Sequence, residues 1–214
     1  MRISRTPRWI WQLAIGCAVL IGPHALATTS MQVVDQQGKP LADAVVELIG
    51  SAADSTQAPK GTMTQQGLMF VPFVLAVQAG TAVEFPNLDK TRHHVYSFSE
   101  TKVFELKLYA GKPEKPVLFD KPGIVVLGCN IHDHMQAFVY VGTSPYLAVS
   151  DEQGQVTFAK APAGTVKVRV WHPWQQAALP EQQLELQDKM AALVLPITAQ
   201  EKPKPPKRGF GQSY

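Results

Sequence analysis

The sequence Gly128-Cys129-Asn130-Ile131-His132-Asp133-His134-Met135 places a thiol, an imidazole and a thioether at the spacing Cys-x-x-His-x-x-Met. It follows the apolar run Ile124-Val125-Val126-Leu127, which is typical of a buried strand. A further imidazole lies upstream, in the pair His93-His94. Loops on a rigid β-scaffold are a common location for binding residues. We therefore expect one site formed by this loop together with an upstream histidine.

Cysteine, histidine and methionine side chains together are the ligand set of a blue-copper site. Thiolate and thioether groups suit Cu(I), whereas imidazole suits both Cu(I) and Cu(II). The sequence therefore predicts one mononuclear copper ion. Three alternatives stay open: either member of the pair His93-His94, His134 in place of His132, and a backbone oxygen in place of Met135. For Cys129 the alternative without a metal is a buried structural cysteine.

Residues 63–141 consist of short apolar or alternating segments separated by turn residues. The clearest alternation is Val103-Phe104-Glu105-Leu106-Lys107-Leu108-Tyr109, which has its charges on one face. Turn residues at Gly80 and at Asp120-Lys121-Pro122-Gly123 interrupt the chain. Short strands with frequent turns predict an all-β protein built as a β-sandwich.

Residues 63–141 resemble the cupredoxin family, which includes plastocyanin and amicyanin. The resemblance lies in the loop 129–135, in the run Phe85-Pro86-Asn87-Leu88-Asp89 before the histidine pair, and in the turn Phe119-Asp120-Lys121-Pro122-Gly123. It implies a Greek-key cupredoxin sandwich that binds copper. The resemblance assigns the ligands as follows: Cys129 as the thiolate, His132 as the downstream imidazole and Met135 as the axial thioether.

The resemblance also selects the upstream ligand. Cupredoxins follow this histidine with one residue and then a valine, and Val95 fits that count from His93. Two positions depart from the family pattern: His94 stands where asparagine is frequent, and Leu127 stands where an aromatic residue is common. Neither position is a ligand, but both affect the groups around the metal and hence its reduction potential.

A second unit is indicated on both sides of this copper domain. The pattern Val33-Val34-Asp35...Gly38...Pro40-Leu41...Ala44-Val45-Val46 resembles the opening strands of carboxypeptidase-regulatory, prealbumin-like domains, and residues 151–166 resemble their later strands. Either piece alone would make a thin sheet of marginal stability. We therefore expect one discontinuous prealbumin-like sandwich that carries the copper domain as an insertion, with a β-hairpin over residues 28–50.

The first 27 residues have the pattern of a secretory signal peptide. Three arginines precede an apolar run of 14 residues, and Ala25-Leu26-Ala27 gives a small-residue cleavage signal. The run is shorter than the ~20 residues that cross a bilayer as a helix. Cleavage after Ala27 would leave a periplasmic protein with no membrane span, about zero net charge and one cysteine. The basic pI therefore implies no nucleic-acid partner.

The predicted organisation has five parts. They are a signal peptide at 1–27, N-terminal strands of the second sandwich with a linker at 28–60, the copper domain at 61–143, C-terminal strands of the second sandwich at 144–198, and a disordered tail at 199–214. In the last part, residues 202–208 are all Lys, Pro or Arg, a composition that cannot form a core.

These features predict a periplasmic blue-copper protein that transfers single electrons between redox proteins. The whole chain resembles exported plastocyanin-like proteins described as methylamine-utilisation proteins, which implies amine oxidation and partners of the cytochrome or amine dehydrogenase type. Enzymatic activity is not expected, because four protein ligands leave no open metal position for a substrate. The alternatives are copper storage or delivery without redox cycling, and a non-metal binding module that uses the second sandwich. His172, between two tryptophans, is a candidate for a second metal site.

Overall fold

The computed structural model describes residues 28–50, 60–159, 161–162, 164–187 and 192–206. The predicted signal peptide, the linker residues 51–59 and the tail residues 207–214 lie outside this described part. Strands, turns and extended segments make up the described residues, with no helix among them, so the prediction of an all-β protein is confirmed. None of these residues therefore forms a helix suited to crossing a membrane.

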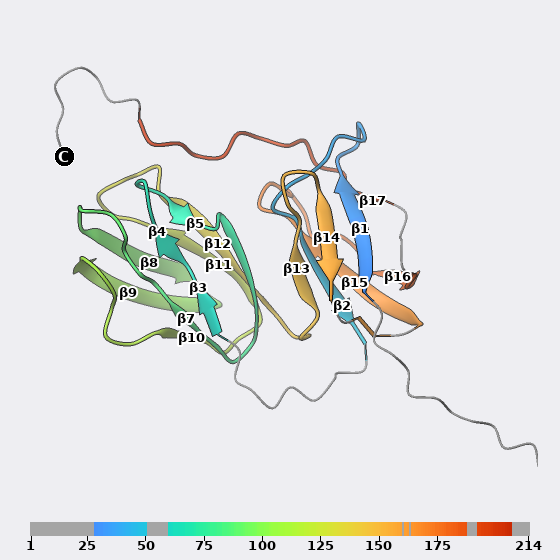
Figure 1. The fold of residues 1–214 in the computed structure, drawn as a ribbon, viewed down its shortest axis with the longest axis horizontal. Coiled ribbons are helices and arrows are strands. Elements are labelled where there is room, and N and C mark those ends of the chain that lie inside the picture. Colours follow the sequence, from blue (N-terminus) through green and yellow to red (C-terminus); the bar gives the residue numbers. More distant parts are fainter. Residues whose placement is uncertain (1–27, 51–59, 160, 163, 188–191, 207–214) are drawn as a thin grey trace, which may run out of the picture.

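The strands form two units, which lie side by side in Figure 1. The first unit covers residues 60–143, on the left of that view, and its large sheet faces a smaller one. The large sheet has the order β6 (Val74–Gln78), β12 (Gln136–Gly142), β11 (Gly123–Gly128), β8 (His93–Ser99) and β9 (Lys102–Tyr109). The smaller one has the order β10 (Val117–Phe119), β7 (Thr81–Glu84) and β3 (Lys60–Thr62), and a two-stranded ribbon joins β4 (Thr64–Gln65) to β5 (Phe70–Val71).

The core of the first unit lies between its sheets, because inward and outward side chains alternate along each strand. On β8 the side chains of His93, Val95 and Ser97 are buried, whereas their neighbours are partly or fully exposed. The buried cluster contains fourteen residues, namely Met63, Phe70, Val77, Val83, Phe85, Val95, Phe119, Val125, Leu127, Cys129, Met135, Ala137, Val139 and Val141. Cys129 and Met135 are therefore part of the core even though they lie on a loop.

The second unit contains the remaining strands, which come from both ends of the described chain. One sheet has the order β14 (Gln155–Phe158), β1 (Thr29–Val34) and β17 (Leu193–Val194), and the other has β13 (Leu147–Val149), β2 (Val45–Ile49), β15 (Thr165–Trp171) and β16 (Gln182–Glu185). Thus β1 pairs with β14, and β2 pairs with both β13 and β15. A separate hydrophobic cluster, which includes Val33, Val46, Leu48, Val156 and Val168, fills the space between them.

The predicted β-hairpin over residues 28–50 is wrong, because β1 and β2 belong to different sheets. The turn after β1 forms as expected, with Asp35 Oδ1 accepting the N–H groups of Gln37 and Lys39. Beyond it the chain makes only one antiparallel bridge back to β1, at Pro40. Asp43 then adopts a φ of 63°, and Ser150 Oγ accepts the Ala44 N–H. These contacts carry the chain across to the second sheet.

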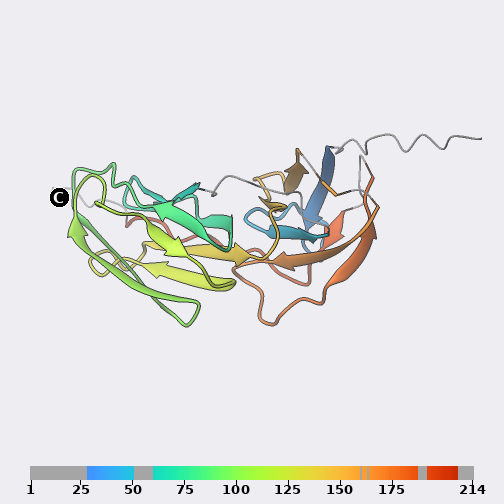
Figure 2. The same cartoon turned by 90° about the horizontal axis from the view of Figure 1, so that it is seen from below.

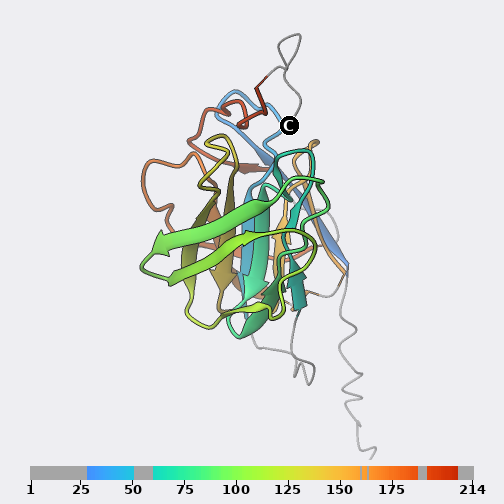
Figure 3. The same cartoon turned by 90° about the vertical axis from the view of Figure 1, so that its left-hand side faces the viewer.

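The two units share an apolar interface. Phe138 and Tyr140 on β12 and Val74 and Ala76 on β6 pack against Trp171, Trp174 and other residues of the second unit. Figure 2 shows the two units in contact along this boundary, and Figure 3 looks along the molecule with the first unit in front. The second unit thus covers the outer face of the large sheet on the side of β6 and β12.

Residues 199–206 of the predicted disordered tail are extended chain with specific contacts. Lys202 Nζ lies 2.6 Å from Asp43 Oδ2 and 3.1 Å from Glu152 Oε1. The same ammonium group lies 5.8 Å from the ring centroid of Phe73 in the first unit. The segment runs along the top of the molecule in Figure 1, and Pro205 and Pro206 line a pocket together with residues 67–68 and 89–91. Ion pairs of Lys202 position this segment, and Ala199 at its start packs against the hydrophobic cluster of the second unit.

Candidate metal centre

His93 occupies the first position of β8, and its side chain is fully buried. Its ring faces the interior because the side chains of a strand alternate between the two faces of a sheet. The strand is irregular between His93 and Val95, where the register with β9 shifts. The Nε2 atom lies 2.9 Å from Asp89 Oδ2, and the Nδ1 atom lies 3.2 Å from Nδ1 of His132. His93 therefore directs Nδ1 toward the loop.

The loop after β11 is closed by its own backbone. The Cys129 N–H donates to the Met135 carbonyl at 3.2 Å, and the Met135 N–H donates to the His132 carbonyl at 2.9 Å. These bonds fold the short segment into a compact turn and bring the His132 ring back over Cys129. The His132 Nδ1 atom lies 3.7 Å from Cys129 Sγ.

Three donor atoms converge as a result. Nitrogen atoms of His93 and His132 and the sulfur of Cys129 all lie within 4.8 Å of one another. Two ligands on one tetrahedral or trigonal metal ion are about 3.3–3.7 Å apart, given metal–nitrogen and metal–sulfur bonds of roughly 2.0 and 2.3 Å. The N–S distance of 3.7 Å lies in that range, and the N–N distance of 3.2 Å lies just below it. The donor set therefore fits a single soft or borderline metal ion.

Neutral imidazoles suit this role. Burial, followed by the nearby imidazoles of His93 and His134, lowers the pKa of His132. A low pKa leaves the ring neutral at physiological pH, and a metal ion binds only the neutral ring. Cys129 is 4 % exposed and forms no disulfide, so its sulfur is protected from the solvent. A buried structural cysteine would not require the convergence of its sulfur with two imidazole nitrogens.

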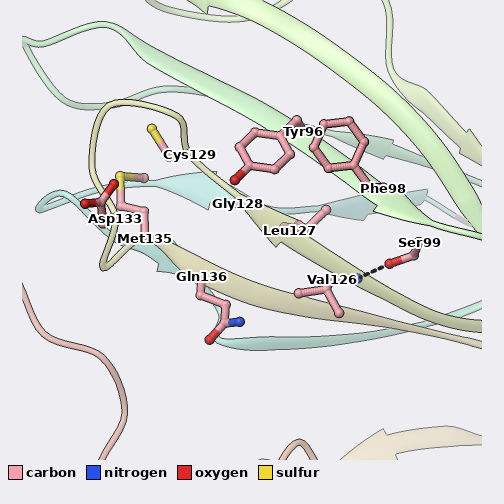
Figure 4. Close-up of a pocket in the computed structure, with 10 residues that line it drawn as sticks. All are labelled: Tyr96, Phe98, Ser99, Val126, Leu127, Gly128, Cys129, Asp133, Met135 and Gln136. Carbon is pink, nitrogen blue, oxygen red and sulfur yellow. Dashed lines mark hydrogen bonds between the residues drawn. The ribbon is translucent and has the colours of Figure 1, made fainter.

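Met135 is the fourth residue of the predicted set. Its side chain is 1 % exposed and packs in the same hydrophobic cluster as Cys129. Both residues also line one cavity of about 540 Å³, whose wall is shown in Figure 4. The structure thus places the thioether at the base of the loop that carries Cys129 and His132.

The two neighbouring histidines point elsewhere. His94 lies on the outer face of the large sheet, where its Nε2 is 2.9 Å from Glu105 Oε1. His134 turns toward the β4–β5 ribbon, where its Nε2 donates to the Leu68 carbonyl at 2.9 Å. Strand and loop geometry therefore separate His93 from His94 and His132 from His134.

Two residues next to the site were not identified from the sequence. Asp89 contacts His93 from a position four residues before it in the sequence. This spacing could have indicated the contact, since carboxylates commonly orient metal-binding imidazoles. The ring of Tyr96 lies over Gly128, the residue before Cys129, as Figure 4 shows. Tyr96 and the 81 % exposed Phe98 continue outward along β8 with ring centroids 5.1 Å apart.

His172, the candidate for a second metal site, has other partners. The ring is fully buried, its Nε2 lies 3.0 Å from the Ala42 carbonyl, and its Nδ1 accepts the Trp174 N–H at 3.2 Å. Burial is the main cause that lowers its pKa. A neutral ring with both nitrogens bonded to backbone groups acts as a structural bridge between β15 and the segment before β2.

Comparisons with known proteins give partial structural likenesses. No protein-family model matches the chain, and no curated protein matches it. The solved structures that resemble it include a copper-containing nitrite reductase from Thermus scotoductus, with 25 % identity, a TM-score of 0.38 and coverage of 45 % of this chain and 25 % of that one. A purple cupredoxin from Nitrosopumilus maritimus has 19 % identity, a TM-score of 0.35 and coverage of 38 % and 99 %. Amicyanin from Paracoccus versutus has 14 % identity, a TM-score of 0.34 and coverage of 48 % and 100 %. Each likeness therefore covers less than half of this chain.

Proposed function

We propose that the protein binds one copper ion through His93, Cys129, His132 and Met135 and carries single electrons. The observation that supports this most strongly is the convergence of one nitrogen each of His93 and His132 with the Cys129 sulfur within 4.8 Å, where His93 and Cys129 are buried. Sulfur and imidazole ligands together accommodate both Cu(I) and Cu(II). Bound copper would supply the one-electron redox couple.

The residues of the chain would hold the ligands almost fixed during a redox cycle. His93 is anchored by a strand and by Asp89, and the loop is closed by two backbone hydrogen bonds. Side chains held by packing and hydrogen bonds keep a metal site in one geometry. A small change of geometry per electron is what a carrier requires.

Electrons would leave through the side of the loop that faces the solvent. His132 is partly exposed, and Ile131 beside it is 49 % exposed. We propose a redox protein, of the cytochrome or amine dehydrogenase type, as the partner at this surface. Such encounters commonly bury less than about 1,200 Å² and are weak. The same proposal places the mature protein in the periplasm, with the second unit as a supporting scaffold.

The test is an optical titration of the purified mature protein with copper. We expect an intense visible band, because a cysteine thiolate bound to Cu(II) gives strong charge-transfer absorption. Cys129→Ala should abolish the band. His94→Ala is the matched control and should keep it, since this ring bonds to Glu105 on the other face of the sheet.

Three outcomes are informative. Absence of copper binding by the wild type would refute the proposed function. Tight binding of Cu(I) with no visible band after oxidation would indicate storage or delivery instead of electron transfer. Loss of the band in His94→Ala together with its retention in His93→Ala would show that His94, and not His93, is the upstream ligand.

A further inference from the structure

Asp89 is held in a more elaborate way than a surface carboxylate. Its Oδ1 accepts the Gly67 N–H at 2.7 Å, and its Oδ2 accepts the Leu68 N–H at 2.9 Å. Gly67 and Leu68 both have positive φ angles, of 65° and 60°. Two consecutive N–H groups in this conformation form a concave anion-binding turn. The turn between β4 and β5 therefore has a conformation suited to holding this carboxylate.

The third contact of Asp89 sets the tautomer of His93. Oδ2 also lies 2.9 Å from Nε2 of His93, and an ionised carboxylate can only accept hydrogen bonds. Both carboxylate oxygens already accept a backbone N–H group, from Gly67 and from Leu68, so the turn holds Asp89 as an acceptor. The proton of the neutral His93 ring must then lie on Nε2. Nδ1 keeps its lone pair, directed at His132 and Cys129.

The same turn also contacts the loop that carries the other donors. The Leu68 carbonyl accepts Nε2 of His134 at 2.9 Å, two residues after His132. Leu68 therefore donates to the carboxylate that orients His93 and accepts from the loop that positions His132. Upstream and downstream ligands, 39 residues apart in sequence, are joined through one two-residue turn.

We propose that Asp89, held by the Gly67–Leu68 turn, is a positioning residue that sets the tautomer of His93 and keeps its Nδ1 available for copper. The proposal rests on the copper site proposed above. An orienting carboxylate raises the basicity of a metal-binding imidazole, and losing such a partner typically weakens metal binding about 10- to 100-fold. Its negative charge also favours Cu(II) over Cu(I), which lowers the reduction potential.

The variant Asp89→Asn tests this role. The amide has one oxygen for three donors, so its nitrogen faces either a backbone N–H or the His93 ring. We expect copper affinity to fall about 10- to 100-fold and the reduction potential to rise. In the metal-free variant, nitrogen NMR of His93 should show loss of the pure Nε2–H tautomer. Asp89→Glu, which keeps the charge on a longer side chain, should recover part of the affinity.

Asp133→Asn is the matched control, because it removes the same charge from an exposed position in the loop. It should leave affinity within about twofold and the His93 tautomer unchanged. Nitrogen NMR of His93 in the unmodified metal-free protein tests the proposal even if the variant fails to fold. The proposal requires the proton to lie on Nε2 of His93. A proton on Nδ1, or equal affinities in the wild type and Asp89→Asn, would overturn it. If the positioning role of Asp89 fails in this way but the copper-loaded wild type shows the visible band, the proposed copper site still holds. Absence of copper binding by the wild type would refute the copper site itself.

Discussion

At Gly128, next to the proposed metal ligands, the structure leaves no room for a side chain. A Cβ atom there would lie 2.8 Å from both Cζ and the hydroxyl oxygen of Tyr96, closer than real Cβ contacts. Gly128 and Tyr96 are also direct partners across β11 and β8. The missing side chain lets the aromatic ring cover the strand immediately before Cys129. A glycine is therefore required here by close approach, and its φ plays no part in the requirement.

The substitution Gly128→Ala should be destabilising. The added methyl group must displace the Tyr96 ring or shift the strand, and such overpacking costs about 1–3 kcal/mol in the free energy of unfolding. Urea denaturation of the single variants and of the double variant measures the cost. In a Tyr96→Ala background the penalty of Gly128→Ala should disappear, because the clashing ring is gone. An equal penalty in both backgrounds would show that the backbone, and not the ring, resists the methyl group.

Some of the site could be predicted residue by residue, and some could not. The spacing of Cys129, His132 and Met135 was sufficient to bring these residues into one loop. Between His93 and His94, the resemblance to cupredoxins favoured His93, because those proteins have a valine two residues after this histidine, as Val95 is here. The structure turns the ring of His93 inward, since adjacent strand residues face opposite sides. The orienting role of Asp89 was not predicted, since it depends on a turn more than 20 residues away in the sequence.

Strand β2 connects the two units through a buried charge. Glu47 is fully buried, and its carboxylate accepts from five donors, which are the Tyr140 hydroxyl, the N–H and hydroxyl of Thr143, the Ser144 N–H and Arg169 Nη1. Tyr140 belongs to β12 of the first unit, whereas Arg169 belongs to β15 of the second. This one carboxylate therefore fixes the path of the chain where it passes from one unit to the other.

The variant Glu47→Gln should lower the free energy of unfolding by about 3–5 kcal/mol at neutral pH. It removes the buried negative charge that pairs with Arg169, and it places an amide NH₂ group, which is itself a donor, next to hydrogen-bond donors of the protein. Chemical denaturation measures the loss. Glu181→Gln is the control, since Glu181 binds the same arginine from the exposed side and should cost less than about 1 kcal/mol. Equal effects of the two variants would contradict the role given to burial.

The stabilisation from Glu47 should also depend on pH. Burial alone would raise the pKa of Glu47, but the bonds from Tyr140, Ser144 and Thr143 outweigh it and lower the pKa below 4.5. A carboxyl group with a lowered folded pKa stabilises fully above its unfolded pKa and loses this contribution as the pH falls through the folded value. The difference between the wild type and Glu47→Gln should therefore be constant above about pH 5 and shrink in more acidic solution. A difference that grows on acidification would refute this assignment.

At the level of elements, the strands were predictable but one of their pairings was not. Alternation and turn residues located β8, β9 and β11 because each strand carries its own pattern. The error at residues 28–50 has a local cause: Gly38 and Pro40 indicate a turn, and a turn does form there, held by Asp35. Pairing was decided further along, by the positive φ of Asp43 and by a bond to Ser150, more than 100 residues away.

Across the whole molecule, the interface makes the two units depend on each other. Phe73 of the first unit packs edge-on to Phe138, with ring centroids 5.4 Å apart, and lies 6.4 Å from Trp174 of the second unit. Trp171 lies 5.6 Å from Phe138 on the other side. The sequence indicated two sandwiches but gave no sign of this contact, because an interface between units has the same apolar composition as a core.

We expect both units to unfold in one transition, because exposing either one also exposes the shared aromatic cluster. The chain supplies a probe for each side. Trp171 and Trp174 are the only tryptophans outside the predicted signal peptide and both lie at the interface, while Cys129 is the corresponding single thiol and is buried in the first unit. In the metal-free protein, tryptophan fluorescence and pulsed thiol labelling should therefore give the same urea midpoint.

Phe73→Ala should separate the two midpoints by weakening the interface, whereas Leu108→Ala, at a 48 % exposed position on β9, should leave them together. Separate midpoints in the wild type would mean that the units fold independently and that the interface contributes little to their stability.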